Sequence, residues 1–192
     1  ECSFLLKERK EGGSRNMENN LQIRRYVDTD FDEVASLVKE MYYYYWVELL
    51  HGGEMSTEYA RHTVATDLLV PGTYVYVAED REAKKLVGFV SYYVTHGGAF
   101  FLDYLWVEKE YLDTRLREAF LEKVEEDVRE AGEDQYSVRI GVRDRLYGEF
   151  LIIQGFDTLN QLEITKYLKK VPERRYTAEN VEIFGYKFKR VI

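Results

Sequence analysis

Residues 99–132, AFFLDYLWVEKEYLDTRLREAFLEKVEEDVREAG, hold the clearest structural pattern of the chain. Residues 99–107 are apolar on both alternating faces except for Asp103, which predicts a central strand covered on both sides. A polar turn follows, and then apolar side chains at helical spacing predict a helix over residues 113–131 that ends at Gly132; they are Leu116, Phe120, Val124, Val128 and Ala131. Because a turn from strand to helix directs free backbone N–H groups at one point, we expect a site for a phosphate or another anion here.

The composition is that of one globular domain. Of 192 residues, 45% are hydrophobic and 15% aromatic, which allows a substantial core and excludes general disorder. No uninterrupted apolar run approaches the roughly 20 residues of a membrane span, so we expect no membrane segment and no membrane partner. The single cysteine, Cys2, excludes a disulfide framework, and His51, His62 and His96 are too scattered for a metal site. We therefore expect a cytoplasmic protein without a metal.

The net charge of −8 is unevenly spread. Residues 166–192 hold eight Lys/Arg and three Glu, so the rest of the chain is strongly acidic. An acidic surface repels nucleic acid, and we expect no nucleic-acid partner. The basic C-terminal segment is either a solvated face or a local dock for an acidic group.

The remaining elements follow from alternation, caps and breakers. Residues 1–16 lack the pattern of a secretory signal and are expected to be a tail, residues 17–170 one domain, and residues 171–192 an extension with an added strand. The predicted elements are a strand at 21–27, a helix from a cap at Thr29 or Asp30 to residue 50, a helix from Ser56 or Thr57 to residue 70, strands at 74–78, 86–95 and 136–142, a helix at 145–154, a strand region at 156–168, and a strand at 181–191 with a kink at Gly185. This order defines a mixed α/β or α+β layer architecture.

Five consecutive aromatic residues, YYYYW at 42–46, lie near the end of the first predicted helix. Consecutive side chains point all round a helix, so they cannot all be buried on one face. They form either a wide core with some exposed tyrosines, or an aromatic wall of a ligand site or partner surface.

Two phrases, LDYLWVEKEYLDTRLREAFLEKVEEDVREAG and IIQGFDTLNQLEITKYL, in this order of elements resemble the GNAT superfamily of acyl-CoA-dependent N-acetyltransferases. The resemblance covers residues 21–170 approximately. It implies a central mixed β-sheet flanked by helices, with acetyl-CoA as the cofactor and an amine as the acceptor. In that family the central strand and the strand corresponding to residues 136–142 splay apart, and the pantetheine arm of the cofactor lies in the gap.

The resemblance also implies which residues hold the cofactor. Along the strand edge and the turn these are Leu105, Trp106, Val107, Leu112, Asp113, Thr114, Arg115, Leu116 and Arg117. Where the family usually has glycines, this chain has Arg115 and Arg117, and a cation in the first helical turn opposes the helix dipole by about 0.3–1 kcal/mol. Either Arg115 pairs locally with Glu118 or Glu110, or both arginines bind a polyanion through charge-assisted hydrogen bonds.

Asp103 and Tyr147 are the candidate catalytic residues. Asp103 is the only charge in its strand, and a buried carboxylate with a raised pKa suits a general base that deprotonates an ammonium. The alternative is a structural carboxylate bound to Arg139 or to a tyrosine. The family's general acid is a Tyr four residues before a Gly-Phe pair, where this chain has Leu151, and Tyr147 one turn earlier could substitute for it.

Two functions follow from these residues. The first is an N-acetyltransferase that acts by direct transfer on a small-molecule or protein amine. The second is a GNAT-like binding or assembly module that no longer binds CoA, with the aromatic run and the strand at 181–191 as contact surfaces. An exposed C-terminal strand could also pair across a homodimer.

Overall fold

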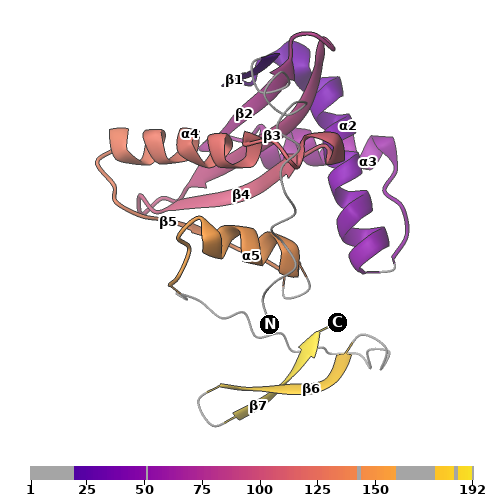
Figure 1. Ribbon diagram of the computed structural model, residues 1–192, viewed down its shortest axis with the longest axis vertical. Coiled ribbons are helices and arrows are strands. Elements are labelled where there is room, and N and C mark those ends of the chain that lie inside the picture. The colour runs from indigo at the N-terminus through magenta and orange to yellow at the C-terminus, as the bar shows by residue number, and fades with distance from the viewer. Residues whose placement is uncertain (1–19, 51, 142–143, 159–175, 184–185, 192) are drawn as a thin grey trace.

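The computed structural model describes residues 20–50, 52–141, 144–158, 176–183 and 186–191. Its main sheet has five strands whose spatial order equals their order in the chain (Figure 1). They are β1 (Leu21–Arg25), β2 (Thr73–Asp80), β3 (Lys85–Val94), β4 (Phe100–Val107) and β5 (Tyr136–Val138). The first three pairings are antiparallel, and β4 pairs with β5 in parallel. The predicted α/β fold with a mixed central sheet is therefore confirmed.

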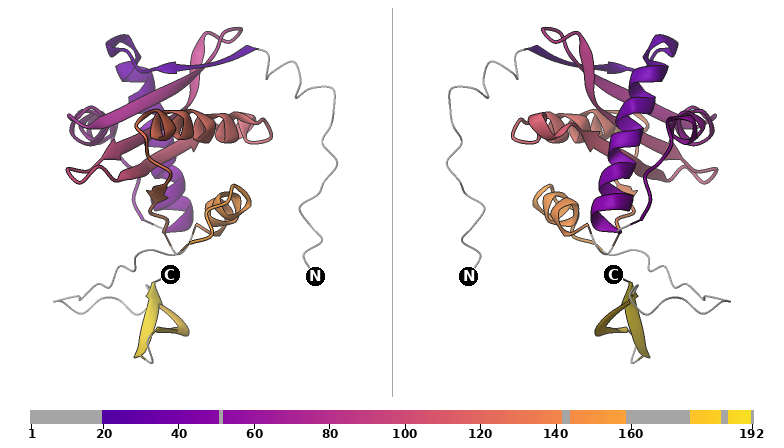
Figure 2. Two further views of the ribbon diagram at one scale, coloured as in Figure 1. Left: turned by 90° about the vertical axis from the view of Figure 1, so that its left-hand side faces the viewer. Right: turned by 90° about the vertical axis from the view of Figure 1, so that its right-hand side faces the viewer.

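Helices cover both faces of this sheet (Figures 1 and 2). One face carries α4 (Leu116–Glu130) and α5 (Arg145–Ile153). The other face carries α2 (Phe31–Tyr42) with the π-helical η2 (Tyr43–Leu49), and α3 (Thr57–Thr63) with the π-helical η3 (Val64–Leu68). Two short 3-10 turns, η1 (Asp28–Asp30) and η4 (Lys109–Tyr111), precede α2 and α4.

The sheet is covered on both faces because its strands are apolar at consecutive positions. On β2, Val75 and Val77 pack into the core beneath α2 and α3, whereas Tyr76 and Ala78 pack into the core beneath α4. Successive side chains of a strand point to opposite faces, so a continuous apolar run supplies two cores at once.

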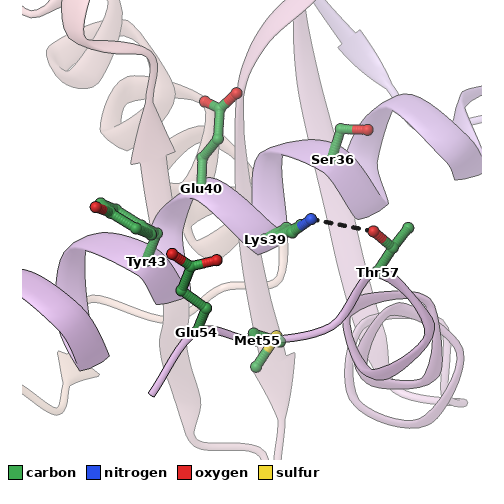
Figure 3. A pocket seen from close by; sticks show the side chains of 7 residues that line it. All are labelled: Ser36, Lys39, Glu40, Tyr43, Glu54, Met55 and Thr57. Carbon is green, nitrogen blue, oxygen red and sulfur yellow. Dashed lines mark hydrogen bonds between the residues drawn. The ribbon is translucent and has the colours of Figure 1, made fainter. Parts of the chain in front are cut away.

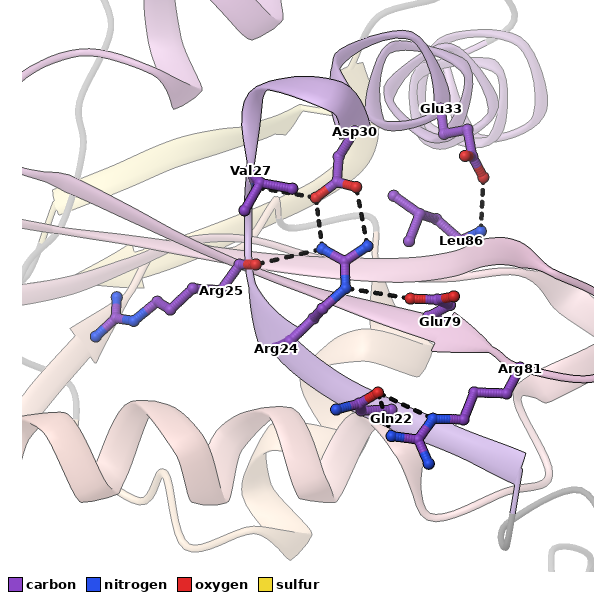
Figure 4. A network of polar contacts seen from close by, with 9 residues as sticks. All are labelled: Gln22, Arg24, Arg25, Val27, Asp30, Glu33, Glu79, Arg81 and Leu86. Atoms are coloured by element: carbon purple, nitrogen blue, oxygen red, sulfur yellow. Dashed lines mark hydrogen bonds and ion pairs between the residues drawn. The ribbon is translucent and has the colours of Figure 1, made fainter.

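A polar network joins β1 to the start of α2 (Figure 4). Arg24 donates two hydrogen bonds to the carboxylate of Asp30, at 2.6 and 2.9 Å, and a third to Glu79 at 3.1 Å. Burial raises the pKa of Asp30, but the hydrogen bonds from Arg24 and from the N–H of Val27 outweigh it and lower that pKa. Asp30 is the N-cap residue of α2, as one of the two predicted positions, but its side chain is engaged by this network and accepts no N–H of the helix.

The two N-terminal helices change type along their length. Each was predicted as one helix, but α2 passes into η2 at Tyr43 and α3 into η3 at Val64. Ser56 caps α3 as predicted, since its hydroxyl accepts the N–H of Tyr59 at 3.1 Å. Tyr43 and Trp46 are exposed, which agrees with the expectation that the aromatic run cannot be wholly buried.

The C-terminal part differs from the prediction in the number of strands. Instead of one kinked strand at 181–191, β6 (Tyr176–Ile183) and β7 (Tyr186–Val191) form a separate antiparallel two-stranded sheet. Residues 156–158 are not in a strand, and the rest of the strand region predicted at 156–168 lies outside the described residues, as does the predicted tail at 1–16. Within the described ranges, no helix is both long and apolar enough to cross a membrane.

Candidate functional site

The edge of β4 that faces β5 becomes free partway along the strand. The parallel pairing ends at Leu102 and Val138, and residues 139–141 are not in a strand, so β5 is shorter than predicted. Because β4 continues to Val107 beside β3, the described residues place no strand against residues 103–107 on the side of β5. Beyond Leu102 and Val138 the two strands are no longer paired, and this unpaired region beside β4 is called the gap below.

Asp103 is the first residue of β4 beyond this pairing, and it lies in a β-bulge. The register between β3 and β4 shifts between Ser91 and Tyr92, which leaves Asp103 without a partner. Since a bulge breaks the alternation of a strand, Leu102 and Leu105 reach the same core although they are three residues apart. The expectation that Asp103 is buried in a fully covered strand is wrong, because its side chain is exposed.

The pKa of Asp103 is raised to about 6 although solvent reaches its side chain. Surrounding protein atoms remove part of the hydration of the carboxylate, which raises this pKa most. The negative charge of Asp67 adds to the rise, and the positive charge of Arg139 opposes it. Among the described residues, Asp103 makes no hydrogen bond or ion pair, so neither Arg139 nor a tyrosine holds it as a structural carboxylate.

Aromatic side chains border Asp103 on the side of α2. The hydroxyl groups of Tyr42 and Tyr104 are joined by a hydrogen bond of 3.2 Å. The ring of Tyr42 meets that of Trp46 edge to face, with 5.5 Å between the centroids. Burial is the largest cause of the raised pKa values of both phenols, and the negative charge of Asp103 adds a smaller rise to each.

The turn after β4 is a compact hydrogen-bonded structure. Tyr111 is buried, and its hydroxyl donates to Asp80 at 2.7 Å. The hydroxyl of Thr114 donates to the carbonyl of Tyr111 and accepts the N–H of Leu116. The helix α4 therefore begins at Leu116, three residues later than predicted.

The first turn of α4 leaves backbone donors free. In the described part of the chain, the N–H groups of Arg117 and Glu118 have no hydrogen-bond partner. Such N–H groups carry the positive end of the helix dipole and suit an anion. These two backbone N–H groups are therefore available to an anion at the turn.

The two arginines of this turn behave differently. Arg115 is exposed and pairs with Glu122 at 3.3 Å, so the local ion pair forms with Glu122 instead of Glu118 or Glu110. The guanidinium of Arg117 lies over the ring of Phe150, 4.3 Å from its centroid, and its Nε is buried without a hydrogen-bond partner. Arg117 therefore connects the start of α4 to α5 through its contact with Phe150, while its buried Nε–H donates no hydrogen bond.

The other predicted cofactor residues divide into core and surface. Leu105, Val107 and Leu116 are core side chains, so their backbone alone can contact a ligand. Trp106 is half-buried, and its indole N–H is buried without a hydrogen-bond partner. Leu112 and Asp113 are exposed at the turn.

Tyr147 is half-buried in the first turn of α5. Its pKa is raised by burial first and then by the negative charge of Asp144, whereas Arg117 opposes the rise. The phenol is therefore protonated at neutral pH. Leu151, at the position where the family has its tyrosine, is a buried core residue.

Asp144 is a polar residue of this site that the sequence did not indicate. It precedes α5, is 4% exposed, and accepts the N–H of Tyr147 at 3.1 Å and the hydroxyl of Tyr44 at 3.3 Å through Oδ1. An Asp before a helix is an ordinary N-cap signal, which explains the contact with Tyr147 and gives no hint of the contact with Tyr44.

One pocket of the surface lies away from these residues. Figure 3 shows this pocket of about 370 Å³ between α2 and the segment before α3, where Lys39 donates to Thr57 at 3.1 Å. None of the predicted site residues lines it. The described residues also contain no group of three or more His, Cys, Asp or Glu side chains that could hold a metal ion.

Comparisons with known proteins establish the fold. No protein-family model and no curated protein sequence matches the chain. An integron cassette protein from the mobile metagenome of V. cholerae superposes with a TM-score of 0.65 at 13% identity, over 78% of this chain and 93% of that one. A ribosomal-protein-alanine N-acetyltransferase from Brucella melitensis gives 0.59 at 16% identity, over 77% and 99%. An acetyltransferase from Desulfovibrio desulfuricans that is assigned to the GNAT family gives 0.56 at 19% identity, over 73% and 87%.

The chain therefore has the fold of the GNAT acetyltransferases, and the predicted resemblance is confirmed at the level of the fold. Fold alone does not fix an activity, which has to be argued from the site.

Proposed function

We propose that this protein is an acetyl-CoA-dependent N-acetyltransferase that transfers the acetyl group directly to an amine. The observation that carries the proposal is Asp103, an exposed carboxylate with a pKa of about 6 at the point where β4 and β5 separate. Such a carboxylate is ionised at pH 7 and can still accept a proton from an ammonium. The N-acetyltransferase from Brucella melitensis among the structural neighbours supports the same reaction class.

The residues around the gap fit acetyl-CoA, which supplies an activated thioester when bound. The side chains of Arg115 and Arg117, with the free N–H groups of Arg117 and Glu118, would hold the pyrophosphate. The free edge of β4 at Leu105, Trp106 and Val107 offers backbone groups to the pantetheine arm. The buried, unpartnered Nε of Arg117 supports this assignment, because buried polar donors are normally satisfied.

Asp103 acts as the general base in this proposal. It takes a proton from the acceptor ammonium, directly or through a water that it orients, and so produces the neutral amine that attacks the acyl carbon. The new C–N bond would replace the C–S bond of the thioester, and the proton that the nitrogen loses as the amide forms would go to the sulfur, which leaves as the free thiol. Holding the two reactants side by side in the gap supplies much of the rate enhancement. A general base and one hydrogen-bond donor are therefore sufficient for the rest.

Tyr147 acts as a hydrogen-bond donor to the leaving sulfur. A thiol has a pKa of about 8.5, and the pKa of Tyr147 is raised above the ordinary tyrosine value, so complete transfer of its proton to a thiolate is uphill. A phenol that stays protonated can nevertheless stabilise the developing negative charge.

The second candidate is a binding or assembly module that does not bind CoA. The contact of Arg117 with Phe150 favours it, because a guanidinium packed between α4 and α5 occupies space beside the turn. In that case Arg117 is a structural bridge, and the exposed aromatic side chains Tyr43 and Trp46 serve as a partner surface.

An acetylation assay separates the two candidates. The purified protein is incubated with acetyl-CoA and a panel of primary amines, and released free thiol is quantified together with the mass of the amine product. The enzyme proposal predicts thiol and acetylated amine in equal amounts, and it predicts that Asp103→Asn abolishes both above background. If no amine is acetylated and acetyl-CoA does not bind, the enzyme proposal is excluded and the binding or assembly module is supported.

A further inference from the structure

Asp144 is a buried carboxylate with one oxygen atom that makes no hydrogen bond among the described residues. Its Oδ1 accepts two hydrogen bonds, whereas its Oδ2 is buried and has no partner among the described residues. The neighbouring Arg145 pairs with Glu149, one turn along α5, at 2.6 Å. A buried carboxylate oxygen without a donor is costly, and such an atom calls for a ligand or a catalytic task as its explanation.

Aromatic rings surround this carboxylate. Tyr44 donates to Asp144, and its ring lies 5.2 Å from that of Tyr45 and 5.9 Å from that of Trp106. Burial first, then the negative charge of Asp144 and a hydrogen bond to it, raise the pKa of Tyr45, so this phenol is a further neighbour of the carboxylate. Tyr147 contacts Asp144 through its backbone N–H, and the pKa of its phenol is raised by burial and then by the same negative charge. A carboxylate among aromatic faces is the chemistry that binds an organic ammonium, through an ion pair and cation–π attraction.

The elements that build this cage border the gap between β4 and β5. Tyr44 and Tyr45 come from η2, Trp106 from β4, and Asp144 from the start of α5. Trp106 is three residues beyond Asp103 on the same strand. Tyr44, which contacts both Asp144 and Trp106, thus links the carboxylate to the part of β4 that follows Asp103.

The hydroxyl of Tyr44 contacts the carboxylate of Asp144. Its hydrogen bond to Asp144 is long, at 3.3 Å, and it belongs to a π-helical segment, a structure often found at functional sites. An ammonium is a charged donor, so it binds a carboxylate more strongly than a neutral phenol does and can take the phenol's place.

We propose that Asp144 binds a second ammonium group of the acceptor, so that the acceptor is a diamine or a longer polyamine. The group at Asp144 does not react, because a carboxylate stabilises the protonated, non-nucleophilic form of an amine. The amine that reacts lies at Asp103. This assignment of the acceptor class rests on the proposed acetyl transfer, whereas binding at Asp144 is measurable without it.

The test is a calorimetric titration of the full chain with butane-1,4-diamine and with n-butylamine, in the absence of acetyl-CoA. We expect the diamine to bind at least tenfold more tightly than the monoamine. The variant Asp144→Asn retains an N-cap side chain of nearly the same shape, since Asn caps helices as well as Asp does. It should weaken binding of the diamine roughly 10- to 100-fold, so that the advantage of the diamine over the monoamine is lost, because it removes one charged hydrogen bond.

A second variant and a separate titration test binding at Asp144 further. Tyr44→Phe removes the competing hydroxyl and retains the ring, and we expect diamine binding that is equal or tighter. Equal affinities of the unmodified protein for the two amines would overturn the inference, as would a diamine affinity unaffected by Asp144→Asn. A separate titration with acetyl-CoA tests the proposed function, so failure of that titration alone is distinguishable from failure of the Asp144 site.

Discussion

Leu102 of β4 and Val138 of β5 are the last residues that the two strands pair, and the next residue of β4 is Asp103 in a β-bulge. Loss of pairing and loss of alternation thus occur at the same point of the strand. Together they leave the edge of β4 without a paired strand and expose the carboxylate of Asp103 to solvent at that edge. The proposed chemistry follows from this coincidence.

Asp103→Asn tests the general base. In the unmodified protein, acetylation should rise with pH through about pH 6, because Asp103 must lose its proton before it can accept one from the acceptor. An asparagine cannot accept this proton, so we expect a loss of roughly 10²- to 10⁴-fold in kcat/KM. Steady-state rates between pH 5 and 8 check this. A variant that retains both the rate and the limb near pH 6 would remove Asp103 from the mechanism.

The same substitution also changes the dependence of stability on pH. The pKa of Asp103 is higher in the folded protein, at about 6, than its ordinary value of 3.8. Between these two values the folded state binds more protons than the unfolded state, so the contribution of Asp103 to stability falls as pH rises from about 4 to 6. Urea unfolding should therefore show Asp103→Asn gaining stability relative to the unmodified protein across that window. A constant difference would contradict the raised pKa.

Arg117→Ala tests the anion site at the start of α4. If Arg117 binds the pyrophosphate, its loss removes charge-assisted hydrogen bonds and should raise the Kd for acetyl-CoA at least tenfold, measured by calorimetry. Arg115→Ala is the matched control in the same turn. We expect it to have a smaller effect, because Arg115 is exposed and paired with Glu122. Unchanged Kd values in both variants would assign the arginines to structure.

Asp127→Ala tests what holds α4 on the sheet. Asp127 accepts hydrogen bonds from the hydroxyl groups of Tyr92 at 2.5 Å and Tyr76 at 2.9 Å, and from Arg25 at 2.8 Å. Tyr92 is fully buried, so its abandoned hydroxyl alone should cost about 1–3 kcal/mol in the free energy of unfolding.

The control for this variant is Glu126→Ala, one residue earlier on the exposed face of α4. It removes a surface ion pair with Lys123 and should change the free energy of unfolding by less than about 1 kcal/mol. Equal effects of the two variants would show that the network around Asp127 does not stabilise the packing of α4.

The sequence predicted those parts of the fold that depend on local pattern. The strand and helix of residues 99–132 were predictable because Leu116, Phe120, Val124 and Val128 repeat at helical spacing, and all four are buried. The two-sided burial of β2 comes instead from its consecutive apolar residues, which enter two different cores. The bulge at Asp103 was not predictable, because it arises from the register between β3 and β4 and leaves no local signal.

The parts of the site that the sequence missed depend on distant contacts. Asp144 is buried, and its carboxylate accepts a hydrogen bond from Tyr44, 100 residues away in the chain. The partner of Arg115 is Glu122, two helical turns further on, where local pairing rules favour residues three or four apart. Tertiary packing decides both of these contacts.

Binding of acetyl-CoA at the gap between β4 and β5 and at the turn before α4 underlies every role proposed for these residues. The most direct measurement is the stability of the unmodified protein, as its unfolding midpoint and free energy, with and without the cofactor. We predict that acetyl-CoA at 100 times its Kd adds about 2.7 kcal/mol, and that Arg117→Ala needs a higher concentration for the same gain. No change in stability at millimolar acetyl-CoA would contradict the claim.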